Sequence, residues 1–151
     1  MINVVISRCL LGENCRYDGG ENKIEKLCEI KKLCNLIPVC PEVLGGLETP
    51  RSPSEIQNGR VIMKNGSDVT ENFTSGAQKA FEIAKKNNCK AAILKAKSPS
   101  CGRDSIYDGS FSGKLTEGDG VFASLLKQEG FVIFTEKETD KILEFLQENE
   151  K

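Results

Sequence analysis

The chain has 151 residues and a net charge of −1, and its 38% hydrophobic and 28% charged residues are typical of one soluble globular domain. Lysine and arginine (21 residues) balance aspartate and glutamate (22 residues), so the composition excludes a strongly basic binder of a nucleic-acid polymer. No apolar run reaches the length of a membrane span and residues 1–6 carry no signal-peptide pattern, so we expect a cytoplasmic protein without a membrane partner.

The first part of the chain predicts a strand, a loop and a helix. Residues 2–6 (INVVI) form a short β-branched apolar run, which indicates a buried strand. Residues 9–20 are rich in glycine, asparagine and aspartate and predict a loop. Apolar residues at helical spacing then predict a helix over residues 22–34.

The next part predicts a weak strand and a hairpin. Residues 36–39 are mostly apolar, but Pro38 cannot donate to a strand ladder, so we expect a very short or bulged strand. Glycine, proline and serine cluster across residues 43–67. This segment predicts a loop that contains a hairpin, with a strand at 60–63 and a turn at Asn65-Gly66.

The second half of the chain alternates helices with strands. Apolar side chains three and four residues apart predict a helix from about residue 70 to Asn87, which Asp68 or Thr70 can cap. Residues 102–120 are rich in glycine and serine and predict a long loop, which we expect to cover a binding site as a lid. The remaining predicted elements are strands at 91–94 and 131–134 and helices at 121–127 and 139–149.

This order of elements predicts the fold class. Strands separated by helices favour right-handed crossovers and a parallel sheet with helices on both faces. We therefore predict an α/β fold: a single three-layer, Rossmann-like domain over residues 1–151 with a mainly parallel sheet.

The 7 cysteines and 0 histidines direct the search for chemistry. Without histidine, a Ser-His-Asp or Cys-His catalytic device and the histidine-bearing zinc sites are excluded. Thiols of a cytosolic protein are mostly reduced, so cysteines in loops are candidates for metal binding or catalysis. Cys9, Cys40 and Cys101 each follow a predicted strand, and the carboxyl ends of parallel strands share one edge, so we expect these thiols to gather there. Cys15, in the first loop, could join them as a fourth ligand.

These thiols also have a simpler interpretation. Free cysteines often fill an apolar core, and we favour that role for Cys28, Cys34 and Cys89, which lie on or near predicted helices. The three strand-end cysteines lie beside proline, glycine or serine in loops, where binding sites are common, so a metal or cluster site and thiol redox chemistry both stay open. Thiolates without histidine suit zinc or an iron-sulfur cluster, but the spacing does not match the C-x2-C pairs of zinc ribbons.

Eight short motifs carry a resemblance to a known family. They are SRCLLG at 7–12, CRYDG at 15–19, PVCPE at 38–42, GG at 45–46, TPR at 49–51, SPSCG at 98–102, IYDG at 106–109 and FSG at 111–113. With them the chain resembles the thiouracil desulfidase family over nearly its whole length. The resemblance implies a [4Fe-4S] cluster that three cysteines hold, whose remaining iron takes the sulfur of a thiolated pyrimidine. The cysteines that match these ligands are Cys9, Cys40 and Cys101.

The resemblance also implies a catalytic glutamate and serine, which match Glu42 and Ser98. We hypothesise that Glu42 acts as a general base on a water that attacks the ring carbon, and that Ser98 orients the ring or shares a proton. The expected reaction is hydrolytic desulfuration of thiouracil to uracil and hydrogen sulfide. The expected partners are this small molecule and the iron-sulfur assembly machinery. A solvated loop carboxylate for Glu42 and a turn hydrogen bond for Ser98 are the plainer alternatives.

Two other classes of protein stay open at this point. In one, the cysteines hold structural zinc and the chain is a binding module, which would contain zinc without iron. In the other, the chain is a sulfur carrier or thiol oxidoreductase whose nucleophile is Cys101 or Cys15. Alkylation of one thiol would then stop activity without changing the metal content.

Overall fold

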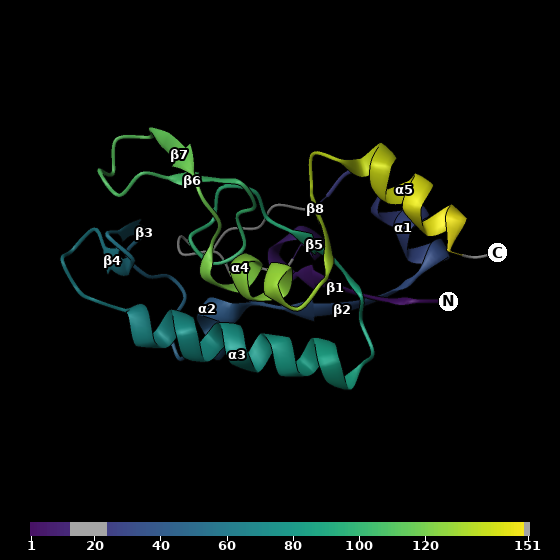
Figure 1. Cartoon of the computed structure of the whole chain (residues 1–151), viewed down its shortest axis with the longest axis horizontal. Helices are drawn as coiled ribbons and strands as arrows, with labels where there is room; N and C mark the ends of the chain where they lie inside the picture. The colour runs from purple at the N-terminus through teal and green to yellow at the C-terminus, as the bar shows by residue number, and fades with distance from the viewer. Residues whose placement is uncertain (13–23, 150–151) are drawn as a thin grey trace.

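A four-stranded parallel sheet forms the centre of the molecule (Figure 1). The structure is a computed structural model, and it describes residues 1–12 and 24–149. Its sheet runs in the order β2-β1-β5-β8, and each pair of neighbouring strands is parallel. The four strands are β1 (Asn3–Ser7), β2 (Asn35–Val39), β5 (Ala91–Leu94) and β8 (Val132–Thr135).

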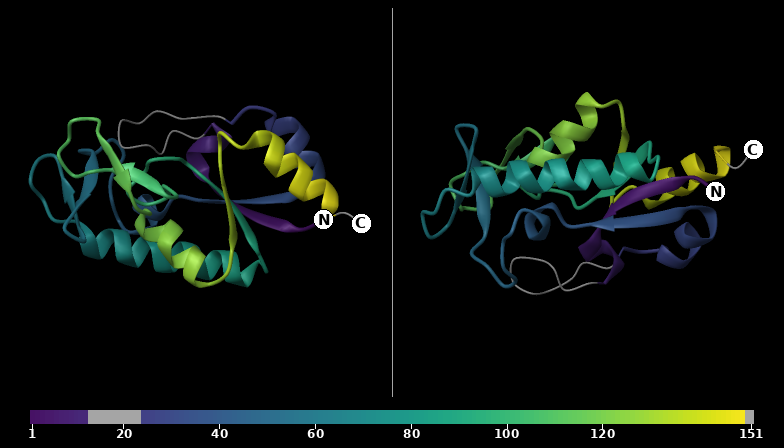
Figure 2. Two further views of the ribbon diagram at one scale, coloured as in Figure 1. Left: turned by 45° about the horizontal axis from the view of Figure 1, so that its top comes forward. Right: turned by 90° about the horizontal axis from the view of Figure 1, so that it is seen from below.

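Helices cover both faces of this sheet (Figures 1 and 2). One face packs against α1 (Leu27–Leu33) and α5 (Thr139–Glu148), and the other packs against α3 (Thr70–Lys86) and α4 (Val121–Gln128). The alternation of side chains along β1 explains the two cores, because Val4 and Ile6 join the first cluster and Val5 joins the second. The predicted α/β fold with a parallel sheet between two helical layers is confirmed.

The position of β1 creates a crevice at the carboxyl edge of the sheet. β1 pairs with β2 on one side and with β5 on the other. The strand order therefore changes direction at β1, because β2 is added on one side and β5 on the opposite side. Ligands of open α/β sheets bind at such a change of direction, outside the carboxyl ends of the strands.

The prediction of a short or bulged strand around Pro38 is wrong. β2 pairs with β1 over five consecutive residues, from Asn35 opposite Asn3 to Val39 opposite Ser7. β2 is an edge strand, and an edge strand tolerates a proline whose missing N–H would face away from the sheet.

Two antiparallel pairs of strands lie outside the main sheet. The predicted hairpin is formed by β3 (Ser54–Gln57) and β4 (Arg60–Met63), but its turn is Asn58-Gly59, where both residues have positive φ. Asn65-Gly66 forms the following turn, in which Gly66 N donates to Met63 O.

The second pair lies within residues 102–120, where the sequence analysis placed only a loop. It consists of β6 (Ser105–Tyr107) and β7 (Leu115–Glu117).

The other predicted helices and strands agree with the structure within a few residues, and α1 begins later than predicted, at Leu27. None of the helices in the described part of the chain has the length and apolar character that a membrane span requires.

Candidate functional site

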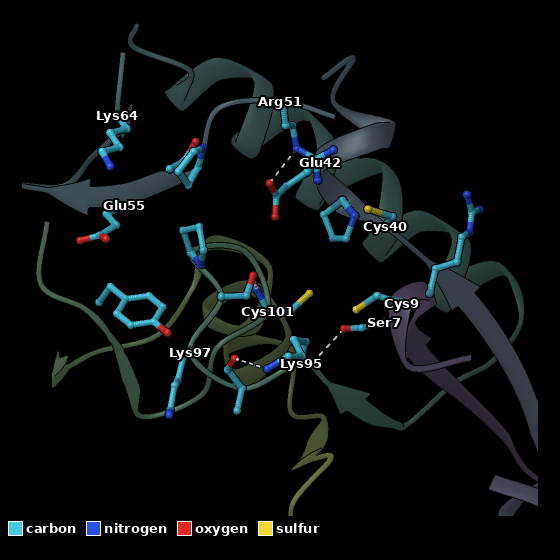
Figure 3. Close-up of a pocket in the computed structure, with 18 of the residues that line it drawn as sticks. Ser7, Cys9, Cys40, Glu42, Arg51, Glu55, Lys64, Lys95, Lys97 and Cys101 are labelled. Atoms are coloured by element: carbon cyan, nitrogen blue, oxygen red, sulfur yellow. Dashed lines mark hydrogen bonds and ion pairs between the residues drawn. The ribbon is translucent and has the colours of Figure 1, made fainter. Parts of the chain in front are cut away.

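A pocket of about 380 Å³ lies at the carboxyl edge of β1, β2 and β5. Cys9, Cys40 and Cys101 all line it, and their side chains are held in buried surroundings (Figure 3). The predicted gathering of these three thiols at one edge is therefore present in the structure. Cys15 lies outside the described residues, so its place relative to the pocket stays a prediction.

Short helical segments position the first two cysteines. Cys9 lies on the 3-10 helix η1 (Arg8–Leu11), which continues directly from β1. Cys40 separates β2 from the single-turn helix α2 (Pro41–Leu44). Both therefore follow their strands directly, as predicted. Cys101 does not, because residues 95–100 form a loop between it and β5.

Ser98 folds this loop back toward the pocket. Its Oγ accepts hydrogen bonds from Ser100 N at 3.1 Å and Cys101 N at 3.0 Å. The turn hydrogen bonds considered for Ser98 are thus present. The hydroxyl also lines the pocket, and its proton is still available for donation, since a hydroxyl can accept and donate at the same time.

The Cys101 thiol lies in a strongly desolvated position. Burial raises its pKa to about 12, and the nearby Cys40 and Glu42 act in the same direction, whereas hydrogen bonding from Ser7 lowers it. Ser100 also lies beside this sulfur, and its buried hydroxyl has no nitrogen or oxygen partner among the described residues. Metal coordination deprotonates such a thiol, because the cation stabilises the thiolate that burial disfavours.

The three cysteines around one pocket supply soft thiolate ligands, which suit zinc or an iron-sulfur cluster. In an iron-sulfur cluster each thiolate binds a different iron, so three thiols around one pocket fit this group.

Glu42 reaches the same pocket from α2. Its carboxylate lies in the pocket beside the three cysteines (Figure 3), and its Oε1 accepts a hydrogen bond from Arg51 Nε at 3.2 Å. Burial raises the pKa of Glu42, and the Arg51 guanidinium partly opposes that shift. The alternative of a solvated loop carboxylate therefore does not describe this residue.

Three comparisons place the chain among known proteins. The model of the 2-thiouracil desulfurase family matches residues 4–138. The chain belongs to the 2-thiouracil desulfurase family. A relative from Bacillus subtilis (strain 168), named "Uncharacterized protein YbbK", is 44% identical in an alignment that covers 93% of this chain and 99% of the relative. A solved structure of the [4Fe-4S]-dependent thiouracil desulfidase TudS is 36% identical and superposes with a TM-score of 0.91, over 97% of this chain and 99% of that one. The predicted resemblance is confirmed.

The pocket of this desulfurase family member also contains side chains that the sequence analysis gave no role. Ser7 Oγ accepts a hydrogen bond from Lys95 N at 3.0 Å and lies beside Cys101. Lys95 in turn forms an ion pair with Glu136, at 3.0 Å between Nζ and Oε2. Ser7 is the last residue of β1. Its position at the carboxyl end of a predicted strand was therefore enough to mark it as a candidate pocket residue.

A second group of pocket residues comes from the two antiparallel strand pairs that lie outside the main sheet. Glu55 on β3, Tyr107 on β6 and Phe111 beyond it all line the cavity. Phe111 belongs to the FSG motif at 111–113. No local motif marks Glu55, because it meets the pocket only when two distant segments of the chain pack together.

Proposed function

We propose that this chain is a [4Fe-4S]-dependent thiouracil desulfidase that converts thiouracil and water into uracil and hydrogen sulfide. The observation that carries the proposal is the convergence of three buried cysteines, from segments beyond three adjacent strands, on one pocket that also contains the partly buried carboxylate of Glu42. The likeness to a solved enzyme with this printed activity supports it over almost the full chain.

Cys9, Cys40 and Cys101 would hold the cluster, and Cys15 stays a candidate for an additional role. When bound, the cluster supplies an iron atom without a protein ligand, which serves as a Lewis acid for the thiocarbonyl sulfur. The three cysteines leave the open side of the pocket for the substrate. We expect the iron-sulfur assembly machinery of the cytoplasm to load the cluster, and we treat residues 1–151 as one desulfidase domain.

Glu42 would act as the general base. Its carboxylate takes a proton from a water molecule while the water oxygen bonds to the ring carbon that carries sulfur. The carbon-sulfur bond then breaks, the oxygen stays on the ring, and the two protons of water leave with the sulfur as hydrogen sulfide. The reaction needs no oxidant or reductant, because water replaces sulfide at the same oxidation level.

Ser98 would orient the ring. Its oxygen is engaged by two backbone N–H groups, so the group it can offer to a substrate is its hydroxyl proton. The remaining carbonyl oxygen of thiouracil is an acceptor of the kind that such a donor needs, whereas its ring nitrogens carry hydrogen and donate.

Anaerobic purification with iron and sulfide analysis, followed by incubation with thiouracil, tests this function. We expect a coloured protein with iron and sulfide in equal amounts, loss of the near-ultraviolet absorption of thiouracil, and release of sulfide. A colourless protein that contains zinc without iron would contradict the proposal and favour a structural zinc module. Turnover that survives removal of iron but stops on thiol alkylation would favour thiol-based sulfur transfer.

A further inference from the structure

The lining of the pocket includes an aromatic residue with a strained backbone. Phe111 lines the pocket and has a φ of +56°. The left-handed region is uncommon for any residue except glycine, and for a bulky side chain it is an outlier that persists only when its surroundings enforce it. Phe111 is the only aromatic residue with positive φ in the described part of the chain.

Buried polar contacts hold Phe111 in this conformation. Glu55, which is 8% exposed, accepts hydrogen bonds through Oε1 from Gly109 N at 2.9 Å and from Phe111 N at 3.1 Å. Gln57 Nε2 donates to Gly109 O at 2.6 Å. Gly109 runs so close to β3 that a Cβ atom there would lie 2.7 Å from the Ile56 carbonyl oxygen. β3 thus clamps the segment that carries Phe111.

A role in core packing does not explain this arrangement. Phe111 belongs to none of the three hydrophobic clusters among the described residues, and it is half-buried rather than enclosed. The clamp instead presents an apolar ring to the pocket at a cost in backbone strain. Figure 3 shows Glu55 on the opposite side of the pocket from Cys9 and Cys40, so space for a small ring lies between the sulfur atoms and the clamped segment.

We propose that Phe111 is a specificity-determining residue that stacks on the flat heteroaromatic ring of the substrate, and that Glu55 is the positioning residue that holds it. The proposal rests on the proposed function and names how the base itself is recognised. Stacking on an aromatic side chain needs only a planar π-face. It therefore selects flat heteroaromatic thiocarbonyl rings over aliphatic thioamides, which have no aromatic face to stack, while the sulfur of the ring faces the cysteines.

The test compares anaerobically purified holoenzymes that carry Phe111→Gly, Phe111→Leu or Phe111→Tyr. For each we would measure KM and kcat with thiouracil, uracil binding by calorimetry, and the melting temperature. Glycine accepts positive φ without strain, so Phe111→Gly should melt at or above the wild-type temperature while its KM and its Kd for uracil rise about tenfold. Phe111→Leu should show the same loss of affinity, and Phe111→Tyr should restore it.

Three results would overturn the stacking role. They are wild-type KM and Kd in Phe111→Gly, a wild-type KM in Phe111→Leu, or a fall in melting temperature for Phe111→Gly with a parallel loss of kcat, which would mean a purely structural role. A wild-type holoenzyme that neither consumes thiouracil nor binds uracil would instead contradict the proposed function. If the wild type is active and Phe111→Gly has the wild-type KM and Kd, only the stacking role is contradicted.

Discussion

Arg51 and Glu42 form a partly buried ion pair at the rim of the candidate cluster site. Arg51 Nε lies 3.2 Å from Glu42 Oε1, and only 4% of the arginine side chain is exposed. The same guanidinium donates from Nη1 to Glu48 O at 2.9 Å and to Thr49 Oγ1 at 3.0 Å. Arg51 therefore fixes one oxygen of the proposed general base relative to the backbone of the following loop.

The planar shape of Arg51 leads to the first prediction. A lysine at this position keeps the charge but cannot satisfy three acceptors that surround a flat guanidinium. We expect Arg51→Lys to lower kcat about 10- to 100-fold, because a small displacement of a catalytic group has that effect, with unchanged iron and sulfide content. Steady-state kinetics on the anaerobic holoenzyme would measure this.

Arg60→Lys is the matched control for this change. Arg60 forms an exposed ion pair with Asp68 and does not line the pocket, so its variant should keep wild-type turnover. Full activity in Arg51→Lys would contradict the positioning of Glu42 by Arg51.

The cysteine ligands give the second prediction. We expect Cys9→Ser, Cys40→Ser and Cys101→Ser each to lose most of the bound iron and to lose turnover by at least the 10- to 100-fold that loss of an outer metal contact costs. Cys28→Ser is the control, because Cys28 is an exposed thiol on α1, and the prediction that it fills the core is wrong. Iron and sulfide analysis beside the thiouracil assay gives the readout. A Cys40→Ser protein with a full cluster and full turnover would remove Cys40 from the ligand set.

Close packing between α2 and α3 gives the third prediction. A Cβ atom on Gly76 would lie 1.8 Å from the carbonyl oxygen of Pro41, so Gly76→Ala forces α2 away from α3. We expect the variant to lose about 1–3 kcal/mol of unfolding free energy, although alanine is intrinsically better in a helix than glycine by about 1 kcal/mol. Turnover should fall as well, because α2 carries Glu42 directly after Cys40.

Ser75→Ala is the control for Gly76→Ala, since Ser75 is an exposed neighbour on the same helix. Denaturant unfolding of both variants gives the free energies. A Gly76→Ala protein that is more stable than wild type would mean that helix propensity outweighs the contact and that α2 can move without cost.

Asp68 gives a prediction for acid stability. Its carboxylate accepts hydrogen bonds from the Thr70 side chain and backbone and pairs with Arg60, and these contacts lower its pKa to about 2. A lowered pKa in the folded state contributes stability that is present above the unfolded-state pKa of about 3.9 and is lost as the pH falls to about 2. Asp68→Asn should therefore melt below wild type near neutral pH.

The difference in melting temperature between Asp68→Asn and wild type should shrink between pH 4 and pH 2. Thermal unfolding followed by circular dichroism across this range measures it. Parallel melting curves with the same separation at every pH would contradict a contribution from the ionised carboxylate. The Asp68 contacts lie at the start of α3, so their loss should not change turnover at neutral pH.

Local patterns in the sequence were sufficient for the main sheet and for three thiols at its edge. The apolar runs before Cys9 and Cys40 predict strands. Parallel strands bring their carboxyl ends to one edge of the sheet even when they are far apart in the sequence. The prediction of a short or bulged strand at Pro38 was wrong because the effect of a proline depends on whether its strand is central or at an edge. That position depends on the strand order of the sheet. The hairpin turn at Asn58-Gly59 does have a local signal, since Asn-Gly is a strong hairpin pattern.

The sequence by itself determined the α/β fold, the family and the three cysteines of the candidate site, because each follows from short-range patterns or contiguous motifs. Only the tertiary structure decided that Ser7 lies against Cys101, that Arg51 fixes Glu42, and that Glu55 clamps the strained Phe111 from 56 residues away. Those contacts join segments that are far apart in the chain or oriented by loops. Their geometry follows from how the layers pack, which no local propensity encodes.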